Sequence, residues 1–155
     1  MSQLSFHSLV GDLTLFENEG SLAAVEWGWG ADQSPSFFLK RAKNQLEEYF
    51  LGKRTVLNIK TVSFESPLKQ NIYDTMKNIP FGKTMTYGQL AKLVSTGPRV
   101  VGRICGQNPM PIVIPCHRVI GANGKLTGYS GDGGIETKIN LLTLEGALPH
   151  KLPIE

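Results

Sequence analysis

The segment TYGQLAKLVSTGPRVVGRICG, residues 86–106, predicts two short helices joined by a tight turn. Thr86 and Gln89 fit a capping box, in which each side chain accepts from the other residue's backbone N–H at the start of a helix. The Ser-Thr-Gly sequence at 95–97 then makes a turn, and Pro98 suits the first position of a second helix. Two short helices joined by a turn containing glycine are typical of a helix-turn-helix, which places its second helix in a groove of DNA.

Further elements are expected on both sides of this helix pair. Ser66 and Pro67 suit the N-cap and the first position of an earlier helix, which ends near residues 79–82. After the pair, the apolar run at 112–114 is expected to be buried, and the turn residues at 121–124 predict a hairpin. A last helix is expected over about residues 135–145. The residues predicted to lie on its buried face are Ile135, Ile139 and Leu142.

The first third of the chain changes from an alternating to a helical pattern. Apolar residues alternate with polar or small ones over residues 4–10, and two further short apolar runs follow, which predicts an antiparallel meander. Residues 36–50 place apolar side chains at steps of three and four, as in an amphipathic helix. We therefore expect an α+β protein of two domains. Residues 1–62 form a small antiparallel β/α domain, and residues 63–155 form a mostly helical, winged-helix-like domain that contains the helix-turn-helix.

Composition excludes several classes of protein. The chain has 155 residues, of which 41% are hydrophobic and 19% charged, as in globular rather than disordered proteins. No apolar run approaches the roughly 20 residues that a membrane-spanning helix needs. Cys105 and Cys116 are too few for a disulfide scaffold, and the three histidines are too scattered for a zinc site of usual spacing. We expect no metal, no membrane partner and a reducing compartment.

The charge is distributed unevenly along the chain. Its formal net charge is only +3, but residues 75–131 contain seven Lys or Arg residues and no Asp or Glu. So long a stretch without an acid indicates a polyanionic partner, most plausibly nucleic acid. The alternative is a solvated basic face whose charge is balanced by acids from elsewhere in the fold.

Cys116 is the candidate nucleophile. It follows the apolar run and a proline, and its neighbours His117 and Arg118 are of a kind that favours the reactive thiolate. Neighbouring side chains of an extended chain point to opposite faces, so His117 would reach the thiol only through a local turn or a bridging water. Glu145 could orient this histidine, because the dipole at the end of a helix disfavours an unpartnered carboxylate. The alternatives are a buried structural cysteine, which fits Cys105 better, and an exposed glutamate.

These motifs resemble those of a known family. The stretch IPCHRV at 114–119 is similar to the active-site motif of the O6-alkylguanine-DNA alkyltransferases, or methylated-DNA–protein-cysteine methyltransferases. Residues 80–91 resemble the segment that leads into the family's helix-turn-helix, and residues 99–102 resemble its recognition helix. Residues 108–111 resemble the asparagine hinge before its active site. Further matches lie at residues 129–131 and 144–146.

The resemblance covers about residues 66–146, and it implies an N-terminal domain of ribonuclease-H-like type with the same order of strands and helix. It also implies roles for single residues. Cys116 would accept the alkyl group, His117 would ionise it through a water, and Glu145 would orient the histidine. The other implied catalytic residues are Asn108, which would brace the turn, and Tyr87, which would donate to the departing guanine. The implied DNA and base contacts are Arg99, which would fill the gap in the base stack, Val119 and Ser130, which would bind guanine through backbone groups, and Arg103, Arg118, Tyr129 and Gly131.

The resemblance implies DNA repair by direct and irreversible alkyl transfer. The alkyl group would pass from O6-alkylguanine, and from O4-alkylthymine, in duplex DNA to Cys116, and one protein molecule would be consumed per lesion. No cofactor is implied, and we expect a monomer in the cytoplasm, associated with the nucleoid in a bacterium, or in the nucleus of a eukaryote. Two alternatives stay open: a module that binds alkylated DNA without chemistry, and a Cys-His-Glu hydrolase.

Overall fold

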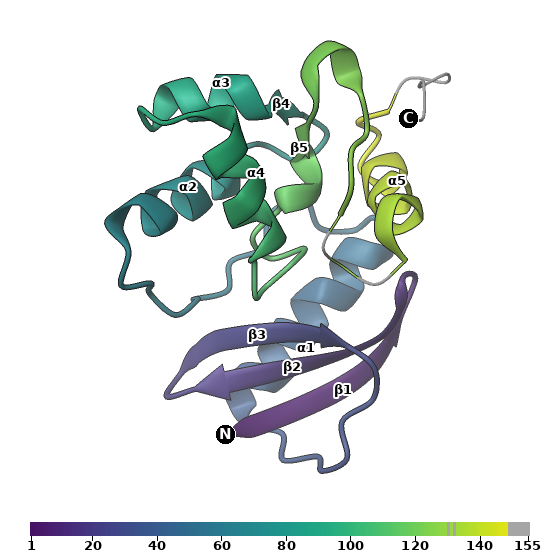
Figure 1. Ribbon diagram of the computed structural model, residues 1–155. Coiled ribbons are helices and arrows are strands. Elements are labelled where there is room, and N and C mark those ends of the chain that lie inside the picture. The colour runs from purple at the N-terminus through teal and green to yellow at the C-terminus, as the bar shows by residue number, and fades with distance from the viewer. Residues whose placement is uncertain (130, 132, 149–155) are drawn as a thin grey trace. The chain divides into compact units, whose positions relative to one another are not determined.

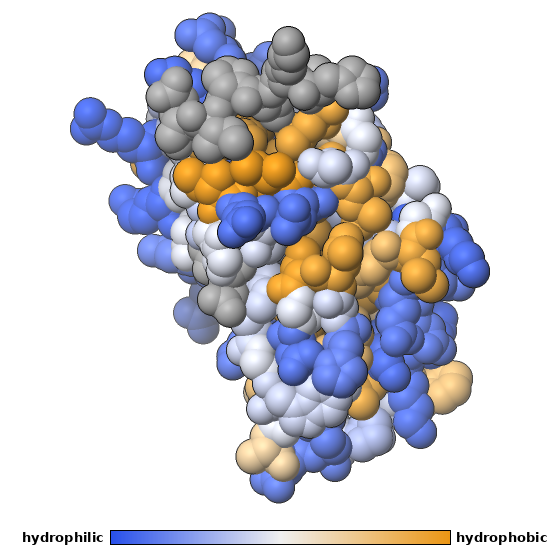
Figure 2. All heavy atoms as spheres, turned by 90° about the vertical axis from the view of Figure 1, so that its right-hand side faces the viewer, coloured by the Kyte–Doolittle hydropathy of each residue, from blue (hydrophilic) through white to orange (hydrophobic). Residues whose placement is uncertain are grey.

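A computed structural model describes residues 1–129, 131 and 133–148, and shows an α+β protein (Figure 1). The chain divides into two compact units, residues 1–62 and 63–155. Within the described part of the chain, no helix has the length and apolar character needed to cross a membrane. On the face drawn in Figure 2, hydrophobic areas are interrupted by hydrophilic side chains.

The first unit is a three-stranded antiparallel sheet with one helix packed against it, as the change of pattern predicts. The strands lie in chain order, and the helix packs on the first two of them. Leu13 and Leu15 of the sheet and Leu39 and Leu46 of the helix are fully buried between them. The elements are β1 (Ser2–Ser8), β2 (Gly11–Asn18), β3 (Ser21–Trp27) and α1 (Phe37–Phe50).

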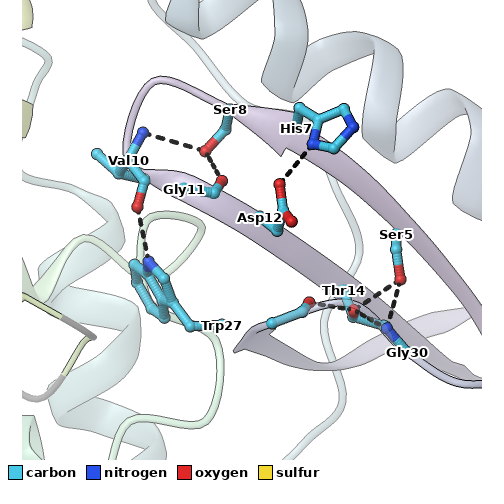
Figure 3. Close-up of polar contacts among 10 residues, drawn as sticks. Ser5, His7, Ser8, Val10, Gly11, Asp12, Thr14, Trp27 and Gly30 are labelled. Carbon is cyan, nitrogen blue, oxygen red and sulfur yellow. Dashed lines mark hydrogen bonds and ion pairs between the residues drawn. The ribbon is translucent and has the colours of Figure 1, made fainter.

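A polar cluster ties the sheet to the loop that follows β3 (Figure 3). Ser5 and Thr14 are paired across β1 and β2, and their buried hydroxyl oxygens lie 2.8 Å apart. The Thr14 hydroxyl donates to Gly28 O at 2.7 Å, and Gly30 N donates to Ser5 Oγ at 2.9 Å. The Gln33 side chain accepts from Ser5 N and donates to Ser5 Oγ. The loop is therefore held by side chains of both strands.

The second unit is mostly helical, and its helices begin where the caps predict. Ser66 Oγ accepts from Lys69 N at the start of the first helix. Thr86 and Gln89 form the capping box, with N···O distances of 2.9 and 3.0 Å. The two helices that follow pack against each other, and their order and short turn are consistent with a helix-turn-helix. The elements are α2 (Pro67–Lys77), β4 (Met85–Thr86), α3 (Tyr87–Leu93), α4 (Pro98–Gly106), η1 (Cys116–Arg118), β5 (Val119–Ile120), η2 (Ala122–Gly124) and α5 (Gly134–Leu144).

Two features of this unit differ from the expectation or add to it. The strand β5 pairs in parallel with β4, which the sequence did not indicate, although the turn at 121–124 does form and Gly121 N donates to Lys125 O at 2.8 Å. The buried face of α5 is also rotated from the predicted one. Leu142 is buried as expected, but Ile135 and Ile139 are only partly buried, and Lys138 is buried in their place.

Candidate functional site

A buried ionic cluster lies next to the candidate cysteine. Cys116, His117 and Arg118 form one turn of 3-10 helix, η1, and Glu145 is the C-cap residue of α5. His117 Nε2 lies 2.7 Å from Glu145 Oε2. Arg118 donates to the same carboxylate through Nε at 2.8 Å and Nη2 at 2.9 Å. The side chains of His117 and Glu145 are fully enclosed, so these charges are screened little by water. The structure therefore brings together a histidine and a glutamate that lie 28 positions apart.

The geometry determines which nitrogen of His117 can act as a base. A carboxylate only accepts hydrogen bonds, so Nε2 must carry the proton that it shares with Glu145. The other nitrogen, Nδ1, is buried and has no hydrogen-bond partner among the described residues. Burial lowers the pKa of His117 below its usual 6.5, although the hydrogen bond and the charge of Glu145 raise it in part. At neutral pH the ring is thus uncharged, with a lone pair on Nδ1.

Arg118 is not placed for the DNA contact that was expected of it. Its residue is only 8% exposed, and its guanidinium is occupied by Glu145 and by Ile79 O, to which Nη1 donates at 2.7 Å. The DNA or base contact of Arg118 was implied only by the resemblance to the family. Its bidentate bond to a buried carboxylate instead makes it an internal partner of Glu145.

The backbone before the cysteine is a tight turn held by Asn108. The Asn108 amide donates to Ile114 O at 2.8 Å, and its carbonyl oxygen accepts from Met110 N at 3.0 Å. Within this turn Ile112 has a φ of 77°, which is unusual for a β-branched residue and costs about 1–3 kcal/mol. Asn108 therefore bonds to both ends of a strained turn that leads directly to Cys116.

The surroundings of the two cysteines differ. Cys105 is a buried residue of α4, and burial, with a smaller contribution from the charge of Cys116, raises its pKa to about 12. Cys116 is 4% exposed, and the charges of both cysteines act to raise the pKa of Lys138 against the effect of burial, with Cys116 contributing more than Cys105. A nearby ammonium favours a thiolate. Cys116 is the better placed of the two to react.

Lys138 is the functional candidate that the sequence interpretation missed. It is 1% exposed, and its Nζ donates to Val119 O at 2.7 Å and lies 5.9 Å from the centre of the Tyr87 ring. Burial lowers its pKa, because charge is costly to desolvate. The sequence did contain a signal for its burial. Lys138 lies three residues before Leu141 and seven before Glu145, so the three share one face of a helix.

Tyr87 and Arg99 line a common cavity of about 610 Å³. Tyr87 is the first residue of α3, and Arg99 is the exposed second residue of α4. Burial raises the pKa of Tyr87, and a hydrogen bond from Thr127 partly offsets this. The charges of Cys105 and Cys116 also act to raise the pKa of Tyr87, by less than burial does. The remaining lining residues are Thr86, Gly88, Pro98, Gly102, Ala122, Thr127 and Gly128.

The other expected site residues are placed in different ways. Val119 is buried and its carbonyl already accepts from Lys138, whereas Arg103 is exposed on α4. Tyr129 and Gly131 are partly buried. Ser130 lies outside the described residues. Within residues 1–129, 131 and 133–148, no group of three or more His, Cys, Asp and Glu side chains could hold a metal ion.

Comparison with protein families matches both units. Residues 67–147 match the DNA-binding domain of 6-O-methylguanine DNA methyltransferase. Residues 4–62 match the ribonuclease-like domain of the same proteins.

Individual proteins are similar over nearly the whole chain. The methylated-DNA–protein-cysteine methyltransferase of Methanosarcina acetivorans is 36% identical over 152 residues, which are 92% of this chain and 96% of that protein. The crystal structure of Mycobacterium tuberculosis OGT in complex with DNA superposes with a TM-score of 0.83 at 33% identity, covering 94% of this chain and 93% of that one. The O6-methylguanine-DNA methyltransferase of Pyrococcus kodakaraensis has a TM-score of 0.68 at 26% identity, covering 94% and 98%.

Proposed function

The chain belongs to the O6-methylguanine DNA methyltransferase family, and from this premise we propose that it removes alkyl groups from O6 of guanine in duplex DNA by transferring them to Cys116. Membership makes it a DNA-repair methyltransferase whose acceptor is a cysteine of the protein itself. We extend the proposal to O4-alkylthymine as a second substrate. We further propose that the protein acts as a monomer, in the bacterial cytoplasm or in the nucleus of a eukaryote.

The buried pair of His117 and Glu145 beside Cys116 is the observation that carries the proposal. Glu145 holds the proton on Nε2, so the lone pair on Nδ1 can take the thiol proton through a bridging water, which would also satisfy that buried nitrogen. The resulting imidazolium would rest against the Glu145 carboxylate. Lys138 would favour the thiolate by its charge.

The thiolate then displaces the base from the alkyl carbon. A sulfur–carbon bond forms, the carbon–oxygen bond breaks, and its electron pair leaves with guanine. Tyr87 would neutralise the departing base by donating to it, since the phenol lines the cavity and has a proton to donate. Asn108 would keep the strained turn, and so the sulfur, in place.

DNA would bind against α3 and α4 with the alkylated guanine turned out of the stack, as chemistry on a base in a duplex requires. Arg99 lines the cavity and is exposed, so it is suited to fill the gap left in the stack. Arg103 would contact phosphate from the same helix. Val119, Tyr129, Ser130 and Gly131 would hold the flipped base, with the free lone pair of the Val119 carbonyl accepting from its amino group.

Intact-protein mass spectrometry after incubation with duplex DNA containing O6-methylguanine tests the proposal. Wild-type protein should gain the mass of one CH2 group, because a methyl group replaces the thiol hydrogen, and repaired guanine should level off at one per protein molecule. Cys116→Ser should gain nothing, because a hydroxyl is a far poorer nucleophile, and Cys105→Ser should behave as wild type.

The same experiment separates the two alternatives. A module that only binds alkylated DNA would show binding without a change in mass. A Cys-His-Glu hydrolase would release product beyond one equivalent. Transfer to Cys105 in place of Cys116 would overturn the assignment of the acceptor.

A further inference from the structure

The hydroxyl of Thr127 bonds to the phenol of Tyr87. Thr127 Oγ1 donates to Tyr87 Oη at 3.3 Å, and the two residues lie 40 positions apart in the chain. Both line the cavity of about 610 Å³. The contact therefore lies at the cavity that Arg99 also lines, and it acts on the group that would neutralise the flipped guanine.

The direction of this hydrogen bond decides what Tyr87 can do. A phenol has one proton to donate and an oxygen that can also accept. Because Oη accepts from Thr127, the phenol proton is left for another acceptor. The ring is held as well, since Lys138 Nζ lies 5.9 Å from its centre. Burial raises the pKa of Tyr87, and the Thr127 bond works against this, which favours giving up the proton.

The local chain holds Thr127 in place for this contact. The side chain of the preceding residue, Leu126, is 1% exposed and anchors the segment. Gly121 lies so close that a Cβ there would be 3.4 Å from Thr127 Cγ2 and 3.1 Å from Lys125 O. The threonine methyl thus packs over a glycine. A β-branched side chain has few rotamers, so packing of the methyl restricts where the hydroxyl can point.

We propose that Thr127 is a positioning residue for alkyl transfer, whose hydroxyl directs the Tyr87 proton to the departing guanine. This inference rests on the proposed function. As the carbon–oxygen bond breaks, its electron pair stays on guanine, which takes the Tyr87 proton. Thr127 then donates to the phenolate that remains. The thiol proton stays on His117, and solvent returns both groups to their neutral forms, so atoms and charges balance.

Single-turnover alkyl transfer from free O6-benzylguanine tests the role without any contribution from DNA binding. Thr127→Val keeps the shape but loses the hydroxyl, and should lower the saturating rate about threefold to tenfold, the effect of one ordinary hydrogen bond. Thr127→Ser restores the hydroxyl and should restore the rate. NMR of tyrosine labelled with carbon-13 at Cζ should show the pKa of Tyr87 rising in Thr127→Val, with Tyr87→Phe assigning the signal.

A double-mutant cycle shows whether Thr127 acts through Tyr87. In a Tyr87→Phe background, Thr127→Val should lower the rate no further. An equal loss in both backgrounds, or a Thr127→Val rate equal to that of wild type, would overturn the inference while leaving the proposed function intact. Failure of wild-type protein to take up any benzyl group at Cys116 would instead count against the proposed function itself.

Discussion

One carboxylate, that of Glu145, serves two basic side chains at once. Its oxygens are bound by His117 Nε2 and by two nitrogens of Arg118, and Gly82 N lies at the longer distance of 3.5 Å from Oε1. Arg118 places a positive charge against the carboxylate and so offsets part of its negative charge. The charge of Arg118 also acts to lower the pKa of His117. Glu145 therefore orients the His117 ring, while the ring itself stays neutral.

Glu145→Gln should slow alkyl transfer about tenfold or more, because the orienting charge behind the base is lost. The base acts only when neutral, and its pKa lies below 6.5, so the wild-type rate should hold through neutral pH and fall only below about 6.5. Glu145 raises that pKa, so the acid limb should move to still lower pH in Glu145→Gln. Single-turnover rates across pH measure both effects.

A matched control separates this role from a loss of fold. Glu136 is an exposed carboxylate in the first turn of the same helix, and Glu136→Gln should leave the rate and its pH profile unchanged. Thermal unfolding shows whether Glu145→Gln remains folded despite the buried Arg118. A folded Glu145→Gln protein with the wild-type rate and profile would rule out the orienting role.

At the scale of single elements, the first turns of α3 and α4 each supply one residue of the proposed site, Tyr87 and Arg99. The capping box places Tyr87 at the start of α3, directly after β4. The parallel pairing of β4 with β5 then links Tyr87 to the residues that follow η1, which carries Cys116. Arg99 lies in the first turn of α4, so in the chain the turn between the two helices separates it from Tyr87.

Arg99→Ala should slow repair of O6-methylguanine in duplex DNA strongly but change the rate with free O6-benzylguanine less than about twofold. A duplex substrate needs its stack held open at a cost of a few kcal/mol, whereas a free base needs no flipping. Arg103→Ala, one turn later on α4, is the control. It should weaken duplex binding but leave the rates with saturating duplex and with free O6-benzylguanine near those of wild type. Equal losses of rate on both substrates would contradict this role and show that Arg99 acts on the base itself, as a residue that lines the pocket.

Local chemistry made the elements predictable from sequence, whereas contacts between distant residues could not be read from it. Ser66 and Thr86 start their helices through bonds to residues three positions on, so the signal lies within a few letters. The burial of Arg118 depends on Glu145 and on Ile79 O, 27 and 39 positions away. Lys138 was missed because lysine usually lies at the surface and its partner carbonyl leaves no trace in the sequence.

For the molecule as a whole, the acid-free stretch should give a steep salt dependence of duplex binding. Its seven basic residues include Arg118, whose charge is committed internally, so at most six are available to DNA. Each phosphate contact releases a counterion, and the logarithm of the affinity should fall linearly with the logarithm of salt concentration, by about 0.9 per contact. Fluorescence anisotropy over a salt series measures the slope.

Charge variants test which surface carries this binding. Arg103→Ala should reduce the slope by about one contact. Lys40→Glu and Lys43→Glu lie in α1 of the first unit, outside the acid-free stretch, and should change it little. A slope near zero in the wild type, or one that depends on Lys40 and Lys43, would place the DNA surface elsewhere.

The buried ammonium of Lys138 should make the stability of the fold depend on whether Cys116 has been alkylated. Before reaction, an ionised Cys116 acts to keep the proton on this lysine, against burial. A thioether is neutral and gives no such compensation, so the reacted protein should unfold at a lower temperature than the unreacted one. Calorimetry on both forms measures the difference, and Lys138→Met should reduce it. A protein that repairs only once would then differ in thermal stability before and after reaction, so that molecules that have reacted could be told from those that have not.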